Sequence, residues 1–188
     1  MVKLQMFITL ILISVRSNSF CQAGHHLGMA IGTSYNHSSF GLTGAGAGVR
    51  FSYERGIAKL FSGSVTISGV IEYSSTSTRY HPGIGFGTYK YTWKNTGVLF
   101  RGIYYQEVTE SFFLYGALSL GPIFTSMTES VEGAAFPSYV APRYPKIRVR
   151  PGAFAGVVYQ WSHPWSIYSE LGYGMLWFST GVRYKIKS

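Results

Sequence analysis

A two-residue hydrophobic period recurs along most of this chain, and it constrains the fold more than any other feature. In the stretch SGSVTISGVIEYS (residues 62–74), Val65, Ile67 and Ile71 alternate with Ser, Thr and, at one position, Glu72. Only an extended strand places alternate residues on opposite faces. The period therefore predicts a sheet with one apolar face and one polar face.

Eight segments carry this period. They span residues 25–36, 42–55, 61–76, 96–106, 111–125, 147–161, 165–175 and 177–187. Most have at least the roughly 9 to 11 residues that a tilted strand needs to cross a bilayer. After residue 23, no apolar run is long enough for a transmembrane helix, which needs about 20 residues. If the chain enters a membrane, it does so as strands.

The connections between these segments alternate in length. Those at residues 56–60, 107–110 and 162–164 are short, whereas those at 77–95 and 126–146 are long and rich in Gly, Pro and Tyr. Outer-membrane barrels have short periplasmic turns and long extracellular loops. Two interpretations remain open for residues 83–93: they extend the third or fourth strand above the membrane, or they form a separate hairpin arm.

The two faces of the predicted sheet differ in charge and in aromatic content. Almost every charged residue of the strands falls on the face opposite to the apolar one. On the apolar face, aromatic residues gather in two rings. The ring at the short-connection end holds Tyr53, Phe61, Tyr104, Phe112, Tyr159, Trp161, Trp165 and Tyr184. The other ring holds Tyr35, Tyr73, Phe124, Tyr173 and Phe178. Tyr and Trp prefer membrane interfaces, so lipid is expected outside and a polar lumen inside.

The composition agrees with a membrane environment. Charged residues make up 12% of the chain, about half of the roughly 25% typical of soluble domains. The sequence therefore predicts an all-β fold, namely an eight-stranded antiparallel transmembrane β-barrel with an up-and-down meander. The alternative is a secreted soluble barrel that holds a small apolar ligand, because alternation alone does not say which face is inside.

The first 23 residues are typical of a secretory signal peptide. A short positive start at Lys3 precedes an apolar run of about a dozen residues, and the sequence Cys21-Gln22-Ala23 ends in a small residue. We expect residues 1–23 to be the signal and residues 24–188 to be the barrel domain of an outer-membrane protein. Cleavage after Ala23 removes the single cysteine and with it any thiol chemistry.

The charged face predicts a closed lumen. An eight-stranded barrel leaves an interior just wide enough for side chains to fill it. Buried charges are tolerated when they are paired and hydrogen-bonded. The residues expected to form this lumen charge network are Arg50, Glu54, Glu72, Arg101, Arg148, Arg150, Glu170 and Arg183. The alternative is an anion-selective pore formed by the excess arginine.

Two segments resemble a known family. The run GVLFRGIYYQEVTESFFLYGALSLG (residues 97–121) places a strand with Arg and Tyr-Tyr before a short turn and a Phe/Leu/Gly strand, and STGVRYKIK (residues 179–187) closes the chain. Both are similar to the small outer-membrane β-barrel domain proteins of Gram-negative bacteria. The resemblance implies an eight-stranded, porin-like barrel.

Candidate sites for chemistry are few. No metal site is expected, because Asp is absent from the sequence and no His-x-x-x-His spacing occurs. We expect no cofactor. We also expect no nucleic-acid partner, although the formal net charge is +9, because many of the arginines are assigned to the lumen. His37 and Ser39 are the residues on which an alternative function, a lipid A-modifying enzyme, would depend. Otherwise no catalysis is expected.

The long connections are the expected binding surface. Their aromatic residues are Tyr80, Phe86, Tyr89, Tyr91, Trp93, Tyr139 and Tyr144. Loops on a rigid scaffold often bind partners, so these residues predict a structural or loop-mediated binding or adhesion role. An extracellular protein or glycan is one possible partner. Lys90, Lys94 and other loop cations are expected to meet the phosphates of lipopolysaccharide, and the apolar face is expected to meet outer-membrane lipids.

Overall fold

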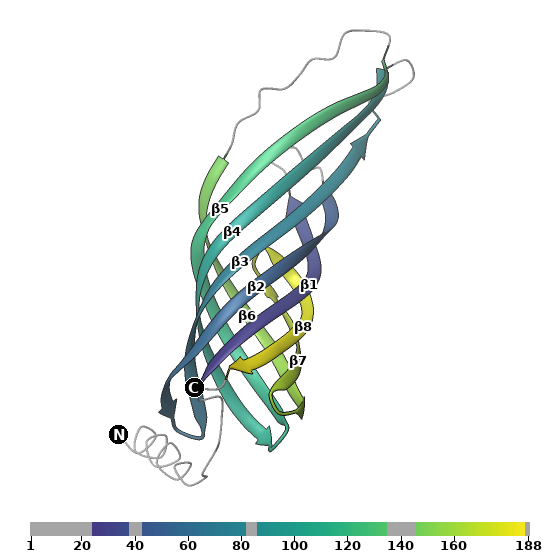
Figure 1. Cartoon of the computed structure of the whole chain (residues 1–188). Coiled ribbons are helices and arrows are strands. Elements are labelled where there is room, and N and C mark those ends of the chain that lie inside the picture. The colour runs from purple at the N-terminus through teal and green to yellow at the C-terminus, as the bar shows by residue number, and fades with distance from the viewer. Residues whose placement is uncertain (1–23, 38–42, 82–85, 135–145, 187–188) are drawn as a thin grey trace, which may run out of the picture.

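The computed structural model of the chain describes residues 24–37, 43–81, 86–134 and 146–186. Eight strands follow one another in a meander, and each pairs antiparallel with its neighbours (Figure 1). The strands are β1 (His25–His37), β2 (Thr43–Leu60), β3 (Gly63–Tyr80), β4 (Phe86–Thr109), β5 (Phe112–Ala134), β6 (Lys146–Ser162), β7 (Trp165–Tyr173) and β8 (Leu176–Ile186). Because β8 pairs back to β1, the sheet closes into a barrel. The predicted fold class is confirmed.

The two ends of the barrel differ. At one end the turns after β2, β4 and β6 contain two residues each: 61–62, 110–111 and 163–164. Phe61 has a φ of 54°, the left-handed conformation that two-residue hairpin turns of this kind require. At the other end lie the longer connections and the β7–β8 turn. Among the described residues, no helix has the length and apolar character to cross a membrane.

The barrel wall has an apolar exterior and a mostly polar interior. The side chains of Phe100 and Leu118 are 77% and 71% exposed, whereas those of Arg50 and Glu72 are fully buried. This alternation follows from the pleat, which sends successive side chains to opposite faces. A small apolar cluster also lies inside, where Met175 of the β7–β8 turn meets Val70, Leu99 and Ile123.

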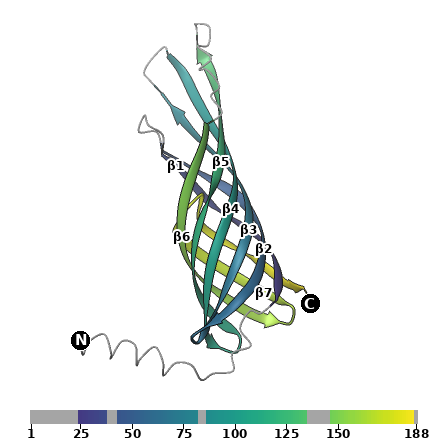
Figure 2. The same ribbon diagram turned by 90° about the vertical axis from the view of Figure 1, so that its left-hand side faces the viewer.

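Three strands continue beyond the closed wall and form an arm (Figures 1 and 2). Strand β2 leaves β3 at Thr76, and β6 leaves β5 at Thr125. Beyond those points β3 still pairs with β4 as far as Tyr80, and β4 pairs with β5 as far as Ala134. We call these upper segments of β3, β4 and β5 (residues 77–80, 86–94 and 126–134) the arm.

The arm corrects part of the sequence interpretation. Most of the expected loop at residues 77–95 is strand, because β3 runs to Tyr80 and β4 begins at Phe86. The expected loop at 126–146 likewise begins with nine further residues of β5, 126–134. Of the two interpretations of residues 83–93, extension of a strand is therefore the correct one for residues 86–93.

Candidate functional site

The lumen is crossed by a network of ion pairs. Arg50 of β2 contacts Glu72 of β3 with its Nη2 atom 2.5 Å from Oε1, and it also pairs with Glu170 of β7. The other carboxylate oxygen of Glu170 lies 2.9 Å from Arg101 Nη2 of β4. Arg183 of β8 pairs with Glu54 at 3.3 Å. Three arginines and three glutamates from five strands thus form ion pairs inside the barrel.

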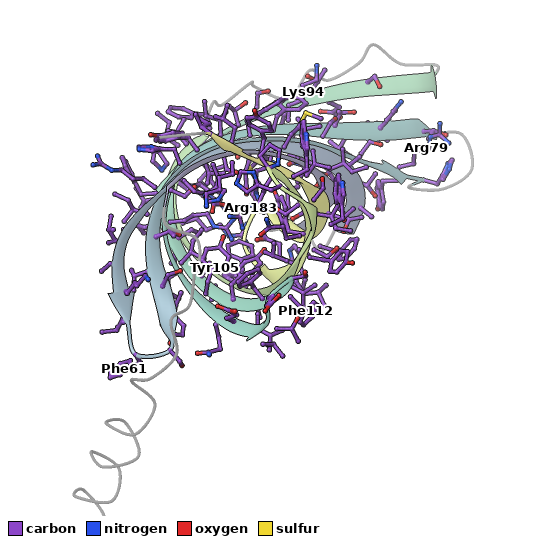
Figure 3. All side chains as sticks on the ribbon, turned by 60° about the horizontal axis from the view of Figure 1, so that its bottom comes forward. Phe61, Arg79, Lys94, Tyr105, Phe112 and Arg183 are labelled. Atoms are coloured by element: carbon purple, nitrogen blue, oxygen red, sulfur yellow. The ribbon has the colours of Figure 1, made fainter. Side chains whose placement is uncertain are left out.

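Aromatic side chains link these pairs into one layer. Tyr115 donates a hydrogen bond to Glu170 (2.8 Å), and Tyr105 donates one to Glu54 (2.9 Å) while accepting one from Arg183 (2.8 Å). The ring of Phe154 lies against Arg101, whose guanidinium carbon is 4.4 Å from its centroid. Figure 3 looks in from the short-turn end and shows Tyr105 and Arg183 within the ring of strands. These links stiffen the lumen around the charges.

Sequence sorting by face does not single out these aromatic residues. Alternation along the strands does place both rings inside the barrel. Tyr105 is four residues after the inward Arg101 on β4, and Tyr115 directly follows the outward Leu114 on β5. Alternation does not predict which groups Tyr105 and Tyr115 bond to. Space for Tyr115 comes from Gly156 on the neighbouring strand, because a Cβ atom there would lie 2.4 Å from the Tyr115 ring.

Arg148 and Arg150 do not join the network. Arg148 is exposed, and Arg150 is half-buried with its guanidinium carbon 4.8 Å from the centroid of the Tyr173 ring. The physical reason is that β6 is longer than β7. Strand β6 begins at Lys146, but its pairing with β7 begins only at Ala153, which lies opposite Tyr173. These two residues therefore lie on the part of β6 that has no β7 partner, and their assignment to the lumen network needs this correction.

The charged layer of the lumen leaves little free volume between its side chains. The cavity between Glu54, Arg101, Tyr105 and Arg183 measures about 10 Å³, which is at the lower limit for one water molecule, about 10–15 Å³. With three positive and three negative side chains, the paired network carries no net charge. At the level of this network the described lumen is therefore packed.

We expect the barrel to carry no sustained ionic current. Reconstituted in a planar bilayer and held at 100 mV, it should show no stable conductance steps, because the charged layer fills the cross-section. A large porin reconstituted in the same way serves as the positive control. Stable steps with anion selectivity would contradict this expectation and would support the anion pore considered above.

The inner face of the arm is aromatic. Tyr89, Tyr91 and Trp93 of β4 share the parity of the inward residues below them; Trp93 is buried, and the Tyr91 and Trp93 rings stack at 6.1 Å. Partial burial and the nearby carboxylate of Glu129 raise the pKa of the Tyr91 hydroxyl. Tyr80 of β3 stands opposite Tyr89 and is 47% exposed. The aromatic residues expected in a loop thus lie largely on an ordered strand.

The outer face of the arm is basic and rich in hydroxyl groups. Arg79 of β3 lies directly opposite Lys90 of β4, and Lys94 lies opposite Ser75 and Ser126. Ser77, Thr128 and Ser130 are exposed on the same face. Figure 3 shows Arg79 and Lys94 on these strands, away from the lumen.

Other predicted residues lie outside the description. Tyr139, Tyr144 and Ser39 fall outside the described residues, and only the backbone is described for Phe86 and His37. Within the described ranges, no group of three or more His, Cys, Asp or Glu residues is arranged to hold a metal ion.

Comparisons with known proteins match the architecture. The chain matches no model of a known protein family and no curated protein sequence. Among solved structures, the crystal structure of Ail, the attachment invasion locus protein of Yersinia pestis, aligns with a TM-score of 0.51 and 12% identity, covering 88% of this chain and 100% of that one. The chain shares the barrel fold of Ail. The expected resemblance to small outer-membrane barrels is thus confirmed at the level of the fold.

Two further structures align less closely. Ail in complex with the heparin analogue sucrose octasulfate gives a TM-score of 0.48 and 14% identity over 88% of this chain and 100% of that one. The translocator domain of the autotransporter NalP from Neisseria meningitidis gives 0.32 and 9% identity over 98% and 95% of the two chains.

Proposed function

We propose that the protein is an integral outer-membrane barrel that is exported by the signal in residues 1–23 and binds partners through its arm. The exterior supports membrane insertion, because large apolar side chains such as Phe100 and Leu118 are exposed around the wall. Aromatic side chains flank this apolar band, as interfacial anchoring requires. Tyr53, Trp161 and Trp165 are exposed at the short-turn end, and Tyr73, Phe124 and Tyr173 at the other.

A soluble barrel with an apolar ligand fits the observations poorly. Such a protein needs an apolar cavity inside and a polar surface outside. In the described part of this chain the interior holds Arg50, Arg101 and Arg183 with their partners, and the cavity between them is about 10 Å³. The test is extraction: the folded chain should leave membranes only with detergent and should migrate differently on gels before and after heating.

The arm carries the proposal of a binding role. It continues for several residues beyond the closed wall, so barrel closure does not require it. Moreover, Arg79 and Lys90 face each other directly across β3 and β4. Like charges in opposed positions destabilise a sheet. An anion held between them relieves this repulsion, so the pair is best explained as a binding site.

Phosphate groups of lipopolysaccharide are the proposed ligand of the basic face. They lie at the outer surface, where the arm stands, and charged hydrogen bonds from Arg and Lys bind phosphate strongly. The hydroxyl groups of Ser77, Thr128 and Ser130 supply further donors beside the cations. The aromatic face with Tyr80 and Tyr91 is the proposed contact for an extracellular glycan or protein.

Neutralising the basic face should weaken this binding strongly. In a variant with Arg79, Lys90 and Lys94 all changed to Gln, each lost cation removes on the order of 1 kcal/mol. The sum of about 3 kcal/mol corresponds to roughly a 100-fold lower affinity. Titration of the detergent-solubilised barrel with lipopolysaccharide measures it, at two salt concentrations because exposed charges are screened.

Two controls complete the titration. Lys59→Gln removes a cation near the short-turn end and should leave the affinity unchanged. Dephosphorylated lipopolysaccharide should bind the original protein as weakly as the intact form binds the triple variant. Equal affinity of the triple variant and the original protein would refute the phosphate site.

The proposal includes no catalysis. The enzymatic alternative depends on His37 and Ser39, for which the structure describes no side-chain geometry. It has a direct test: His37→Ala and Ser39→Ala should leave the acylation pattern of lipid A unchanged.

A further inference from the structure

The outer face of the barrel carries a furrow near its short-turn half. The furrow has a volume of about 660 Å³ and crosses β8, β1, β2, β3 and β4. Its walls are two neighbouring rows of outward side chains. Tyr184, Leu27, Tyr53 and Phe100 belong to one row, and Met29, Phe51, Ile71 and Val98 belong to the other.

A glycine opens the first row. Gly69 of β3 stands in register between Tyr53 of β2 and Phe100 of β4. A Cβ atom at Gly69 would have no heavy atom within 4 Å, apart from the residue's own chain neighbours. The row of large side chains is therefore interrupted at this position, and the furrow is open there toward the short-turn end.

The opening is bordered by polar groups. Arg55 is exposed and pairs with Ile67, so it lies diagonally beside Gly69 on the same face. His25 is the cross-strand partner of Arg55, and its Nδ1 atom lies 2.5 Å from the Tyr53 hydroxyl. A permanent cation thus lies one diagonal step from Gly69, on the same outer face as the apolar furrow and on its short-turn side. This combination matches a molecule with an anionic head and a hydrocarbon tail.

We propose that the furrow binds one anionic phospholipid of the periplasm-side leaflet, with its phosphate at Arg55 and one acyl chain lying in the furrow past Gly69. The proposal rests on the membrane insertion argued above. The acyl chain follows the furrow obliquely, because the furrow crosses the strands and barrel strands tilt by about 35–45° from the membrane normal. At this place a groove, a gap in the row of large side chains and a cation coincide.

The test is native mass spectrometry of the delipidated barrel in detergent, titrated with phosphatidylglycerol. We expect a single tightly retained lipid, with binding at least tenfold weaker in Gly69→Leu, whose side chain fills the gap. The matched control is Gly116→Leu, because Gly116 also lacks neighbours within 4 Å but lies outside the furrow. The control should bind as the original protein does.

Arg55 is tested separately. Arg55→Gln should abolish the preference for phosphatidylglycerol over phosphatidylcholine, and Arg148→Gln, near the opposite end of the barrel, should preserve it. Equal retention by the Gly69 and Gly116 variants would overturn the site. So would a dimer of the original protein that Gly69→Leu dissociates, because the furrow would then bind a second copy. Heat-dependent gel migration shows that each variant is folded, and extraction from membranes only with detergent shows whether membrane insertion itself holds.

Discussion

Glu170→Gln is expected to lower the free energy of unfolding by about 3–5 kcal/mol, the range for breaking a buried ion pair from one side. The carboxylate of Glu170 pairs with both Arg50 and Arg101 and accepts the hydrogen bond of Tyr115. Its loss leaves the lumen with one uncompensated positive charge. Arg50 retains Glu72, so the unpaired guanidinium is that of Arg101, which is left against the Phe154 ring.

The measurement is urea unfolding of the barrel in lipid vesicles, followed by tryptophan fluorescence. Glu110→Gln is the control, because Glu110 lies in the exposed two-residue turn between β4 and β5 and should change the free energy by no more than about 0.5 kcal/mol. A second variant combines Glu170→Gln with Arg101→Met. It restores neutrality and should recover most of the lost stability. A cost below about 1 kcal/mol for Glu170→Gln alone would mean that water reaches the network.

The pairs in this network differ in how far the sequence predicts them. Arg50 and Glu72 are direct cross-strand partners in the β2–β3 hairpin, so face and hairpin register together bring them into contact. Glu170 is 120 residues from Arg50 and meets it across the lumen. That contact depends on how the closed sheet is staggered, and the stagger arises from pairing β8 with β1 rather than from any local pattern.

The sequence predicts the arm only as one of two interpretations of residues 83–93, and the reason is a different one. Period-two hydrophobicity marks a strand only where its two faces meet different environments. Beyond the closed wall both faces of the sheet are polar or aromatic, as at Ser77, Thr78 and Arg79, so the alternation fades while the backbone pairing continues. The Gly- and Pro-rich residues around it then suggest a loop. The register of the β3–β4 hairpin identifies these strands. Glu72 lies opposite Gly97, and the same register continues from there to Tyr80 opposite Tyr89.

The orientation of the wall is tested at Leu118. This residue is six positions from Phe112 and six from Phe124, which mark the two aromatic rings on the same face of β5, so it lies near the centre of the apolar band. Its side chain is 71% exposed. Leu118→Arg should lower the free energy of unfolding from vesicles by about 2–4 kcal/mol, the cost of a cation at the bilayer midplane of a barrel.

Leu118→Arg has no such cost if the outer wall faces water. The size of the stability loss therefore distinguishes a wall that faces lipid from one that faces water. An exposed arginine on a soluble barrel changes stability by no more than about 0.5 kcal/mol. Ser126→Arg supplies the internal comparison, because Ser126 is exposed on the same face of the same strand but lies beyond Phe124, in the arm. The expected result is a large loss at Leu118 and almost none at Ser126. Equal, small effects at both positions would show that the apolar face does not touch lipid, and the membrane assignment would fall with it.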